Sequence, residues 1–124
     1  MGAVIAKNNR IISLGFNGFP PQIEDKPEWL NNREEKYRFT IHAEMNAILN
    51  APANVEGSTL YLSPLAPCPH CAKHIVASGI VKVVAFIDTN SKSPYLNMVE
   101  ESSLIFDTGG VESLWITNPS LLIP

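Results

Sequence analysis

Four residues in two short segments have the types and the spacing that a catalytic metal site requires. His42 is followed two residues later by Glu44, and Cys68 is followed three residues later by Cys71, directly behind Pro67. One imidazole and two thiolates are typical zinc ligands, and three protein ligands leave the fourth position open to water. A carboxylate that is not a ligand can take the proton of that water. The two segments therefore predict a zinc site made by His42, Cys68 and Cys71, with Glu44 as the general acid/base.

Each of these residues has an ordinary interpretation when it stands alone. Two cysteines three residues apart can be a redox pair, and a glutamate in the first turn of a helix is favoured there by the helix dipole. The occurrence of all four in this order favours the catalytic site. His70 and His74 lie close to the cysteines, and we expect both at the surface. The alternative without catalysis is a zinc-stabilised binding module, in which one of these two histidines completes four protein ligands.

Two helices must bring the two halves of the site together. Apolar residues within Ile41–Leu49 recur at i, i+4, i+7 and i+8, which predicts a helix with one buried face. We expect Thr40 to be its N-cap and Pro52 to end it. A second helix begins at Cys68 and ends at Gly79. Cysteines three apart in a first turn point to one side, where the unpaired N–H groups lower the pKa of the thiols.

The remaining pattern describes the sheet that carries these helices. Residues 22–39 are highly charged, so we expect a surface segment there, with a helical turn after Pro27. The run Val81–Ile87 is nearly all apolar, which is typical of a central strand covered on both faces. The predicted strands are Gly2–Ala6, Ile11–Leu14, Gly57–Ser63, Val81–Ile87 and Leu104–Phe106, with a hairpin turn at Lys7–Arg10 and a third helix at Tyr95–Glu101. This order predicts a single three-layer α/β domain over residues 1–124.

Length and composition restrict the class of protein further. A chain of 124 residues with 45% apolar and 17% charged residues is typical of one compact globular domain. Its net charge of −3 gives no basic surface for a long nucleic acid, so we expect a small-molecule substrate. We see no apolar run long enough for a membrane span and no secretory signal, and therefore expect a cytoplasmic protein. Two cysteines so close together favour ligand or redox chemistry over a disulfide framework.

From Gly2 to about Trp115 the chain resembles the deoxycytidylate (dCMP) deaminases of the cytidine deaminase-like superfamily. The H-x-E and P-C-x-x-C pair is the zinc signature of that superfamily. The segments that carry the resemblance are Asn8–Ile12, Gly15–Gly18, His42–Ile48, Pro67–Lys73 and Ser78–Ile80. The resemblance implies a three-layer α/β/α fold with a mixed central sheet of about five strands. It also implies zinc-dependent hydrolytic deamination of dCMP to dUMP and ammonia.

The same resemblance implies roles for further residues. Glu44 would pass a proton to N3 of the pyrimidine and then to the departing amine. Asn17 would contact the deoxyribose, and the backbone N–H of Ala43 would contact the base carbonyl. Many members of the family are hexamers regulated by dCTP and dTTP, which makes Phe16 and Gly18, together with Asn17, candidates for an effector site. The apolar tail Ser120–Pro124 either packs on its own domain or meets another subunit.

The sequence departs from the family pattern before the first strand. Family members usually begin with a helix whose basic, Ser/Thr-containing turn helps to hold the substrate phosphate, and we expect this helix to be absent here. Possible substitutes for the phosphate contact are Lys7, Arg33, Arg38 and Lys92. The alternative substrate is a free nucleoside or another nucleobase compound, because such a substrate needs no phosphate contact. A tRNA adenosine deaminase shares the zinc signature but is disfavoured by the net charge of −3.

Overall fold

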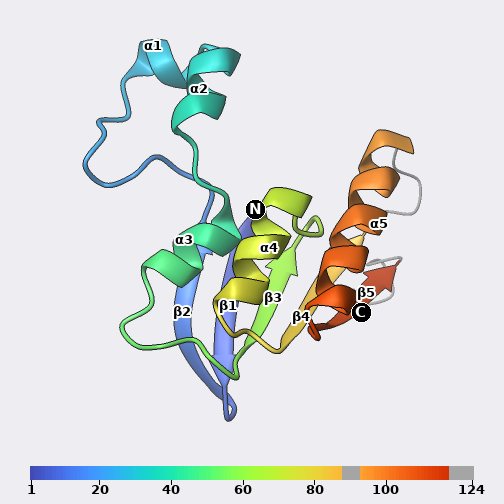
Figure 1. The fold of residues 1–124 in the computed structure, drawn as a ribbon. Coiled ribbons are helices and arrows are strands. Elements are labelled where there is room, and N and C mark those ends of the chain that lie inside the picture. The colour runs from blue at the N-terminus through green and yellow to red at the C-terminus, as the bar shows by residue number, and fades with distance from the viewer. Residues whose placement is uncertain (88–92, 118–124) are drawn as a thin grey trace, which may run out of the picture.

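The fold is built on a mixed five-stranded sheet (Figure 1). The structure, a computed structural model, describes residues 1–87 and 93–117, so Lys92 and the tail Ser120–Pro124 lie outside the described residues. The elements in chain order are β1 (Gly2–Lys7), β2 (Arg10–Phe16), α1 (Pro27–Leu30), α2 (Arg33–Phe39), α3 (Ala43–Leu49), β3 (Thr59–Ser63), α4 (Pro69–Ala77), β4 (Lys82–Ile87), α5 (Ser93–Thr108) and β5 (Glu112–Thr117). The strands lie in the order β2-β1-β3-β4-β5. β1 is antiparallel to β2 and β3, whereas β3, β4 and β5 are parallel.

The first two strands form the predicted hairpin. Asn8 and Asn9 connect them with φ angles of 53° and 64°. Positive φ at both central residues belongs to a two-residue type I′ turn, which asparagine tolerates well. At the opposite end of the hairpin Gly2 pairs with Phe16, and Gly2 also pairs with Ser63 at the end of β3. The loops that follow β2 and β3 therefore start at the same edge of the sheet.

Helices α3, α4 and α5 pack against one face of this sheet (Figure 1). The core lies between them, with Ile5, Val83 and Phe106 completely buried. The opposite face of β4 carries Val84 and Phe86, which are half-buried, and within the described residues no helix lies over them. β4 is an interior strand with a neighbour on each side, as predicted, but in the described part of the chain helices cover it on one face rather than on both. The predicted α/β architecture, a mixed sheet of five strands with flanking helices, is confirmed.

The fifth strand is β5, and the predicted strand at Leu104–Phe106 is wrong. That triplet belongs to α5, a helix of 16 residues of which the predicted helix Tyr95–Glu101 is the first part. Val99, Ser102 and Phe106 are buried at helical spacing, whereas Leu104 is 66% exposed. In a strand, Leu104 and Phe106 would point to the same face. Within the described residues, no helix is both long enough and apolar enough to cross a membrane.

Residues 19–40, here called the α1–α2 segment, project from the body of the domain above the start of α3 (Figure 1). The ring of Phe39 packs against Trp29 and Phe19 at centroid distances of 4.9 and 5.6 Å. Asn32 caps α2 by accepting the backbone N–H groups of Glu34 and Glu35. Neither α1 nor α2 contains a buried residue, which confirms the predicted surface segment.

Candidate metal centre and active site

The start of α3 presents His42 and Glu44. His42 is the N-cap of this helix, and Glu44 lies in its first turn. The N–H of Ala43, which a helix start leaves without a partner inside the helix, donates to Oδ1 of Asn17 at 2.8 Å. The predicted N-cap, Thr40, is instead the residue that follows α2, and both its N–H and its hydroxyl donate to the carbonyl of that helix's fourth residue. The helix start is therefore capped from a loop 26 residues away in sequence rather than locally.

Gly15 allows β2 to lie directly against α3. A Cβ atom at this position would lie 2.1 Å from the carbonyl oxygen of Ala43, closer than any side chain can approach. Beside this contact, Nδ2 of Asn46 donates to the carbonyl oxygen of Phe16 at 2.7 Å. The end of β2, and with it the loop that follows Phe16, is thus held to the helix that His42 caps. Its position is fixed by the close approach of the two backbones at Gly15 and by this side-chain hydrogen bond from Asn46.

The start of α4 presents the two cysteines and is held in place by α5. Cys68 is the N-cap of α4. Just before it, the carbonyl oxygen of Pro67 accepts the hydroxyl of Ser102 at 2.7 Å, and the N–H of Ala66 donates to the hydroxyl of Tyr95 at 3.1 Å. Both α5 residues were missed by the sequence analysis. The position of Tyr95 or Ser102 in the sequence does not indicate a contact near Cys68, because each hydrogen bond joins residues more than 25 positions apart.

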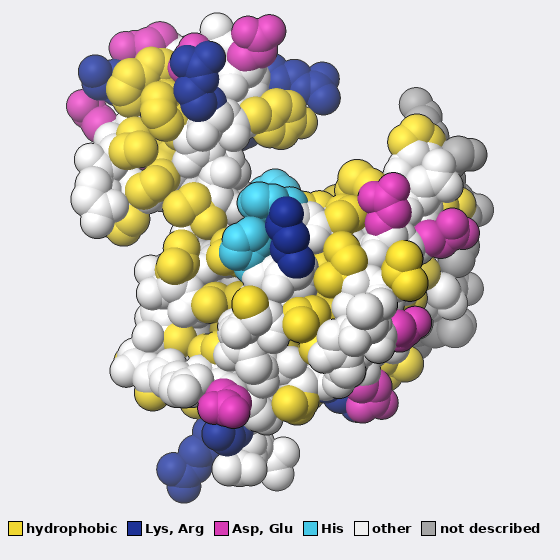
Figure 2. Space-filling view, in the orientation of Figure 1, with side chains coloured by type: hydrophobic (Ala, Val, Ile, Leu, Met, Phe, Trp, Pro, Cys, Tyr) yellow, Lys and Arg dark blue, Asp and Glu magenta, His cyan; other side chains and the backbone are white. Residues whose placement is uncertain are grey.

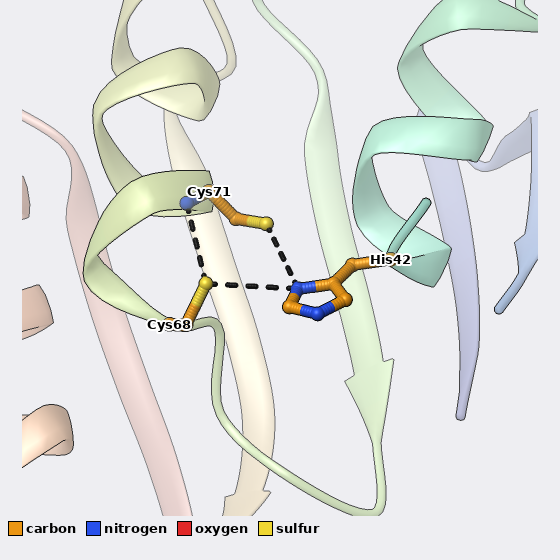
Figure 3. A group of neighbouring side chains, drawn as sticks. All are labelled: His42, Cys68 and Cys71. Atoms are coloured by element: carbon orange, nitrogen blue, oxygen red, sulfur yellow. Dashed lines mark hydrogen bonds between the residues drawn. The ribbon is translucent and has the colours of Figure 1, made fainter. Parts of the chain in front are cut away.

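The three predicted metal ligands converge (Figure 3). Nδ1 of His42 lies 3.6 Å from Sγ of Cys68 and 3.3 Å from Sγ of Cys71, and all three ligand atoms lie within 4.8 Å of one another. Zinc bonded to sulfur at about 2.3 Å and to nitrogen at about 2.0 Å, with tetrahedral angles, places these atoms roughly 3.5 Å apart. The spacing in the structure therefore fits a zinc ion. Within the described residues, this is the one group of histidine, cysteine or acidic side chains that could hold a metal.

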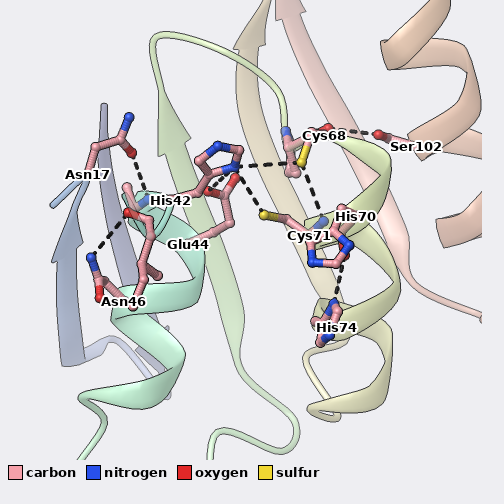
Figure 4. Close-up of polar contacts among 12 residues, drawn as sticks. Asn17, His42, Glu44, Asn46, Cys68, His70, Cys71, His74 and Ser102 are labelled. Carbon is pink, nitrogen blue, oxygen red and sulfur yellow. Dashed lines mark hydrogen bonds and ion pairs between the residues drawn. The ribbon is translucent and has the colours of Figure 1, made fainter. Parts of the chain in front are cut away.

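Glu44 lies beside the three predicted metal ligands but is not itself one of them (Figure 4). Its side chain is 1% exposed, and Oε1 lies 4.0 Å from Nδ1 of His42. Oε1 has no hydrogen-bond partner among the described residues. Such an orphaned polar atom is rare in a protein core and indicates a ligand or water that the site is built to receive. Burial raises the pKa of the Glu44 carboxyl, so this group can carry a proton at a higher pH than an exposed glutamate.

The two thiols differ in their ionisation. The Cys71 thiol and, to a smaller extent, His42 donate to the sulfur of Cys68 and lower its pKa. The neighbouring Cys68 and burial raise the pKa of Cys71. The hydrogen bond with Cys68 also raises the pKa of His42. One thiolate alone is thus readily formed, and a cation between the sulfurs is what allows both to be charged.

The other predicted residues fall at several places around this centre. Asn17 reaches the start of α3, whereas Phe16 is 70% exposed and Gly18 has no atom near the position of an added Cβ. His70 and His74 are both exposed, as predicted, and neither belongs to the metal-binding group. A fourth protein ligand from either histidine, which the binding-module alternative needs, is therefore not offered by this arrangement.

Three of the four predicted phosphate contacts can be located. Lys7 donates to the carbonyl oxygen of Glu56 at the far end of the sheet. The guanidinium of Arg38 is paired with Glu35 at 3.3 Å, and that of Arg33 lies over the ring of Tyr37. None of these three cations lines the cavity described next.

A cavity of about 660 Å³ joins the metal centre to the α1–α2 segment. The body of the domain contributes His42 and Asn17, and α2 contributes Lys36, Tyr37 and the residue that follows it, Thr40. Figure 2 shows the corresponding hollow between the α1–α2 segment and the rest of the molecule. Lys36 and Tyr37 were not among the residues predicted to line the site. The sequence gives only a weak indication of these two residues, because α2 carries charge on all sides. Only the position of α2 in the fold determines which of its side chains face the cavity.

Comparison with known proteins identifies the family. The profile described as "Cytidine and deoxycytidylate deaminase zinc-binding region" matches residues 1–87. The chain belongs to this deaminase family. Zinc is therefore the metal of the His42, Cys68 and Cys71 site, and the chemistry of the family is hydrolytic deamination. A protein of Aliivibrio fischeri named only as an uncharacterized deaminase is 41% identical over 117 residues, which are 94% of this chain and 78% of that protein.

Relatives with a named substrate are also similar to this deaminase. The human deoxycytidylate deaminase is 32% identical over 114 residues, and the match covers 87% of this chain but only 62% of the human protein. The solved structure of a dCMP deaminase from the cyanophage S-TIM5 matches with a TM-score of 0.66 and 26% identity, over 93% of this chain and 79% of that chain. A second structure of the phage enzyme, in complex with dCMP and dUMP, gives a TM-score of 0.65. These structures confirm the predicted cytidine deaminase-like fold.

Proposed function

We propose that this deaminase converts dCMP and water to dUMP and ammonia. The observation that carries the proposal is the buried Glu44 carboxylate beside three zinc ligands, whose Oε1 atom has no hydrogen-bond partner among the described residues. A carboxylate that served only the fold would be paired, because an unpaired buried oxygen costs about 1–3 kcal/mol. The unpaired oxygen lies beside the metal site, where the proposed deamination needs a group that can accept and donate a proton.

The proposed chemistry divides the work between zinc and the side chains. His42, Cys68 and Cys71 would hold zinc, which would lower the pKa of a bound water molecule so that it can lose a proton near neutral pH. Glu44 would take a proton from the water whose oxygen bonds to C4 and give it to N3 of the pyrimidine. It would then carry the remaining hydroxyl proton to the amine as the bond between C4 and that nitrogen breaks. Its raised pKa suits this double role, because a group that both accepts and donates works best when its pKa is close to the working pH.

Asn17 supports recognition of a deoxynucleoside. Its Oδ1 is engaged by the N–H of Ala43, which leaves Nδ2 on the same amide to donate to the sugar. Asn17 and His42 line the same cavity, so a base at the metal centre would bring its sugar to this amide. The predicted contact between Ala43 and the base carbonyl requires that the Ala43 N–H leave Asn17 or be shared with it. The monophosphate as substrate is supported by the named relatives, among them the human and phage enzymes.

The test is a comparison of substrates. The purified, zinc-loaded protein is assayed for ammonia release with dCMP, deoxycytidine, cytidine, dCTP and guanine. We expect the highest kcat/KM with dCMP, and equal values for dCMP and deoxycytidine would refute the proposed substrate. Glu44→Gln should lower turnover by about 100-fold or more and still bind one zinc ion. His74→Gln is the control for the exposed histidines and should keep both zinc and turnover.

A free nucleoside is the second candidate substrate. It is favoured by one observation: the located members of the predicted phosphate set, Lys7, Arg33 and Arg38, do not line the cavity.

The proposal has two further parts, which are regulation by dCTP and dTTP near Phe16 and Gly18, and assembly into a homo-oligomer such as a hexamer. The exposure of Phe16 is consistent with a contact to an effector or to a second subunit. Turnover of dCMP measured with and without each triphosphate tests the regulatory part.

A further inference from the structure

We propose that Lys36 of α2 binds the 5′-phosphate of the substrate and so makes this deaminase selective for a nucleoside monophosphate. The inference rests on the proposed function, since it assigns the phosphate contact that a dCMP deaminase needs. It starts from the cavity that contains both Lys36 and the zinc ligand His42. Among the described residues that line this cavity, Lys36 is the only lysine or arginine.

The position of Lys36 follows from the geometry of α2. Arg33, Lys36, Tyr37 and Thr40 are spaced at i, i+3, i+4 and i+7, so they share one side of the helix. Three of them, Lys36, Tyr37 and Thr40, line the cavity. The backbone carbonyl of Lys36 accepts both the N–H and the hydroxyl of Thr40, which closes the last turn of the helix. The base of the lysine side chain is thus fixed, while its ammonium group can reach a ligand.

The size and polarity of the cavity suit a nucleotide. Its volume of about 660 Å³ lies within the range of roughly 300–1,000 Å³ that holds ligands of this size. A nucleotide whose base is at the metal centre has its sugar near Asn17, and its phosphate then extends toward the α1–α2 segment. No ion pair of Lys36 is found within the described residues, unlike Arg38, which is paired with Glu35. The ammonium is therefore available to a phosphate oxygen.

Two neighbouring groups define the subsite further. The hydroxyl of Tyr37 accepts a hydrogen bond from the guanidinium of Arg33 at 3.3 Å, and Arg33, Lys36 and Tyr37 line a second, smaller cavity. Arg33 thus adds positive potential without entering the substrate cavity. Asp25 also lines the substrate cavity and carries the opposite charge. Its carboxylate would repel a phosphate group, so the attraction must come from a direct contact with Lys36 rather than from the general charge of the wall.

The experiment measures kcat/KM for dCMP and for deoxycytidine in the zinc-loaded wild type and in Lys36→Met. Methionine keeps the length and the helix propensity of lysine but removes the charge. Loss of one charge-assisted hydrogen bond to phosphate should lower kcat/KM for dCMP by roughly 10- to 100-fold and leave the value for deoxycytidine unchanged. Lys36→Arg should recover most of the loss, whereas Lys36→Glu should lose more than Lys36→Met.

Lys26→Met is the matched control. It removes the same charge from the same segment, but Lys26 lies over the ring of Trp29 and does not line the cavity. We expect it to behave as the wild type with both substrates. Equal losses for dCMP and deoxycytidine in Lys36→Met, or no loss for either, would overturn the assignment of Lys36. A wild type that prefers deoxycytidine would instead overturn the proposed function itself, so the two failures give different results.

Discussion

Replacement of Gly15 by alanine should displace the helix that carries His42 and Glu44. Ordinary contact with a Cβ atom begins at 3.4 Å, whereas the new Cβ would lie only 2.1 Å from the carbonyl oxygen of Ala43. β2 and α3 would therefore have to separate by about 1.3 Å at this point. The Cβ would also lie 2.5 Å from the backbone N of Ala47, so no side-chain rotation can relieve the contact.

The energetic cost follows from two effects. Overpacking against fixed backbone costs about 1–3 kcal/mol, and loss of the 2.8 Å bond from Ala43 to Asn17 adds about 0.5–1.5 kcal/mol. We therefore expect Gly15→Ala to lower the free energy of unfolding by about 2–4 kcal/mol. A domain of this size has a total stability of about 5–15 kcal/mol, so the variant should still fold.

Gly15→Ala should weaken zinc binding by more than its cost in folding stability suggests. Metal sites tolerate errors of only about 0.2 Å in ligand distance, and the displaced helix begins directly after His42. Urea unfolding and competition for zinc with a chromophoric chelator measure the two effects separately. Gly18→Ala is the matched control, because no atom lies within 4 Å of its added Cβ and its φ angle is not positive. If Gly15→Ala matched Gly18→Ala in both measurements, the close packing of β2 on α3 would not position the site.

Two other perturbations test how the ligands are held. Ser102→Ala leaves the buried carbonyl of Pro67 without its donor, so it should cost about 1–3 kcal/mol in urea unfolding and weaken zinc binding, because the turn before Cys68 loosens. Its neighbour Ser103, whose hydroxyl accepts the indole N–H of Trp115, provides the control: Ser103→Ala should leave zinc affinity unchanged, and equal zinc affinities for the two variants would contradict the assigned role of Ser102. Removal of zinc with a chelator should lower the melting temperature by about 10 °C or more at free zinc near 1,000 times Kd, because binding then contributes about 4 kcal/mol. Recovery on addition of zinc but not of magnesium would support the site, and an unchanged melting temperature after chelation would count against it.

The metal centre could be predicted from the sequence because its geometry is local. Cys68 and Cys71 are fixed relative to each other by one helix turn, and His42 and Glu44 by another. What the sequence leaves open is how the two turns are held together. Asn17 caps α3 from a distant loop, and Ser102 supports the turn before Cys68 from a helix that the sequence analysis divided into a helix and a strand.

The error at Leu104–Phe106 shows why this support was missed. Three consecutive apolar residues fit a strand as well as one side of a helix, and only burial at Val99, Ser102 and Phe106 decides between them. The same limit applies to the phosphate contact. Lys7, Arg33, Arg38 and Lys36 are alike in sequence, since each is a cation in a polar stretch, and the cavity distinguishes Lys36 from the other three.

Chemistry and selectivity in this deaminase therefore depend on different kinds of structure. The proposed proton carrier, Glu44, and the metal ligands lie at the starts of helices that pack on the sheet, where burial keeps Glu44 in place. The proposed phosphate contact belongs to the α1–α2 segment, which has its own small aromatic cluster and no buried residue in either helix. Because that segment shares few contacts with the core, substitutions in it can change the substrate without a large cost in stability. Selection for a different nucleotide should accordingly act on α2 and leave the two zinc-binding turns intact.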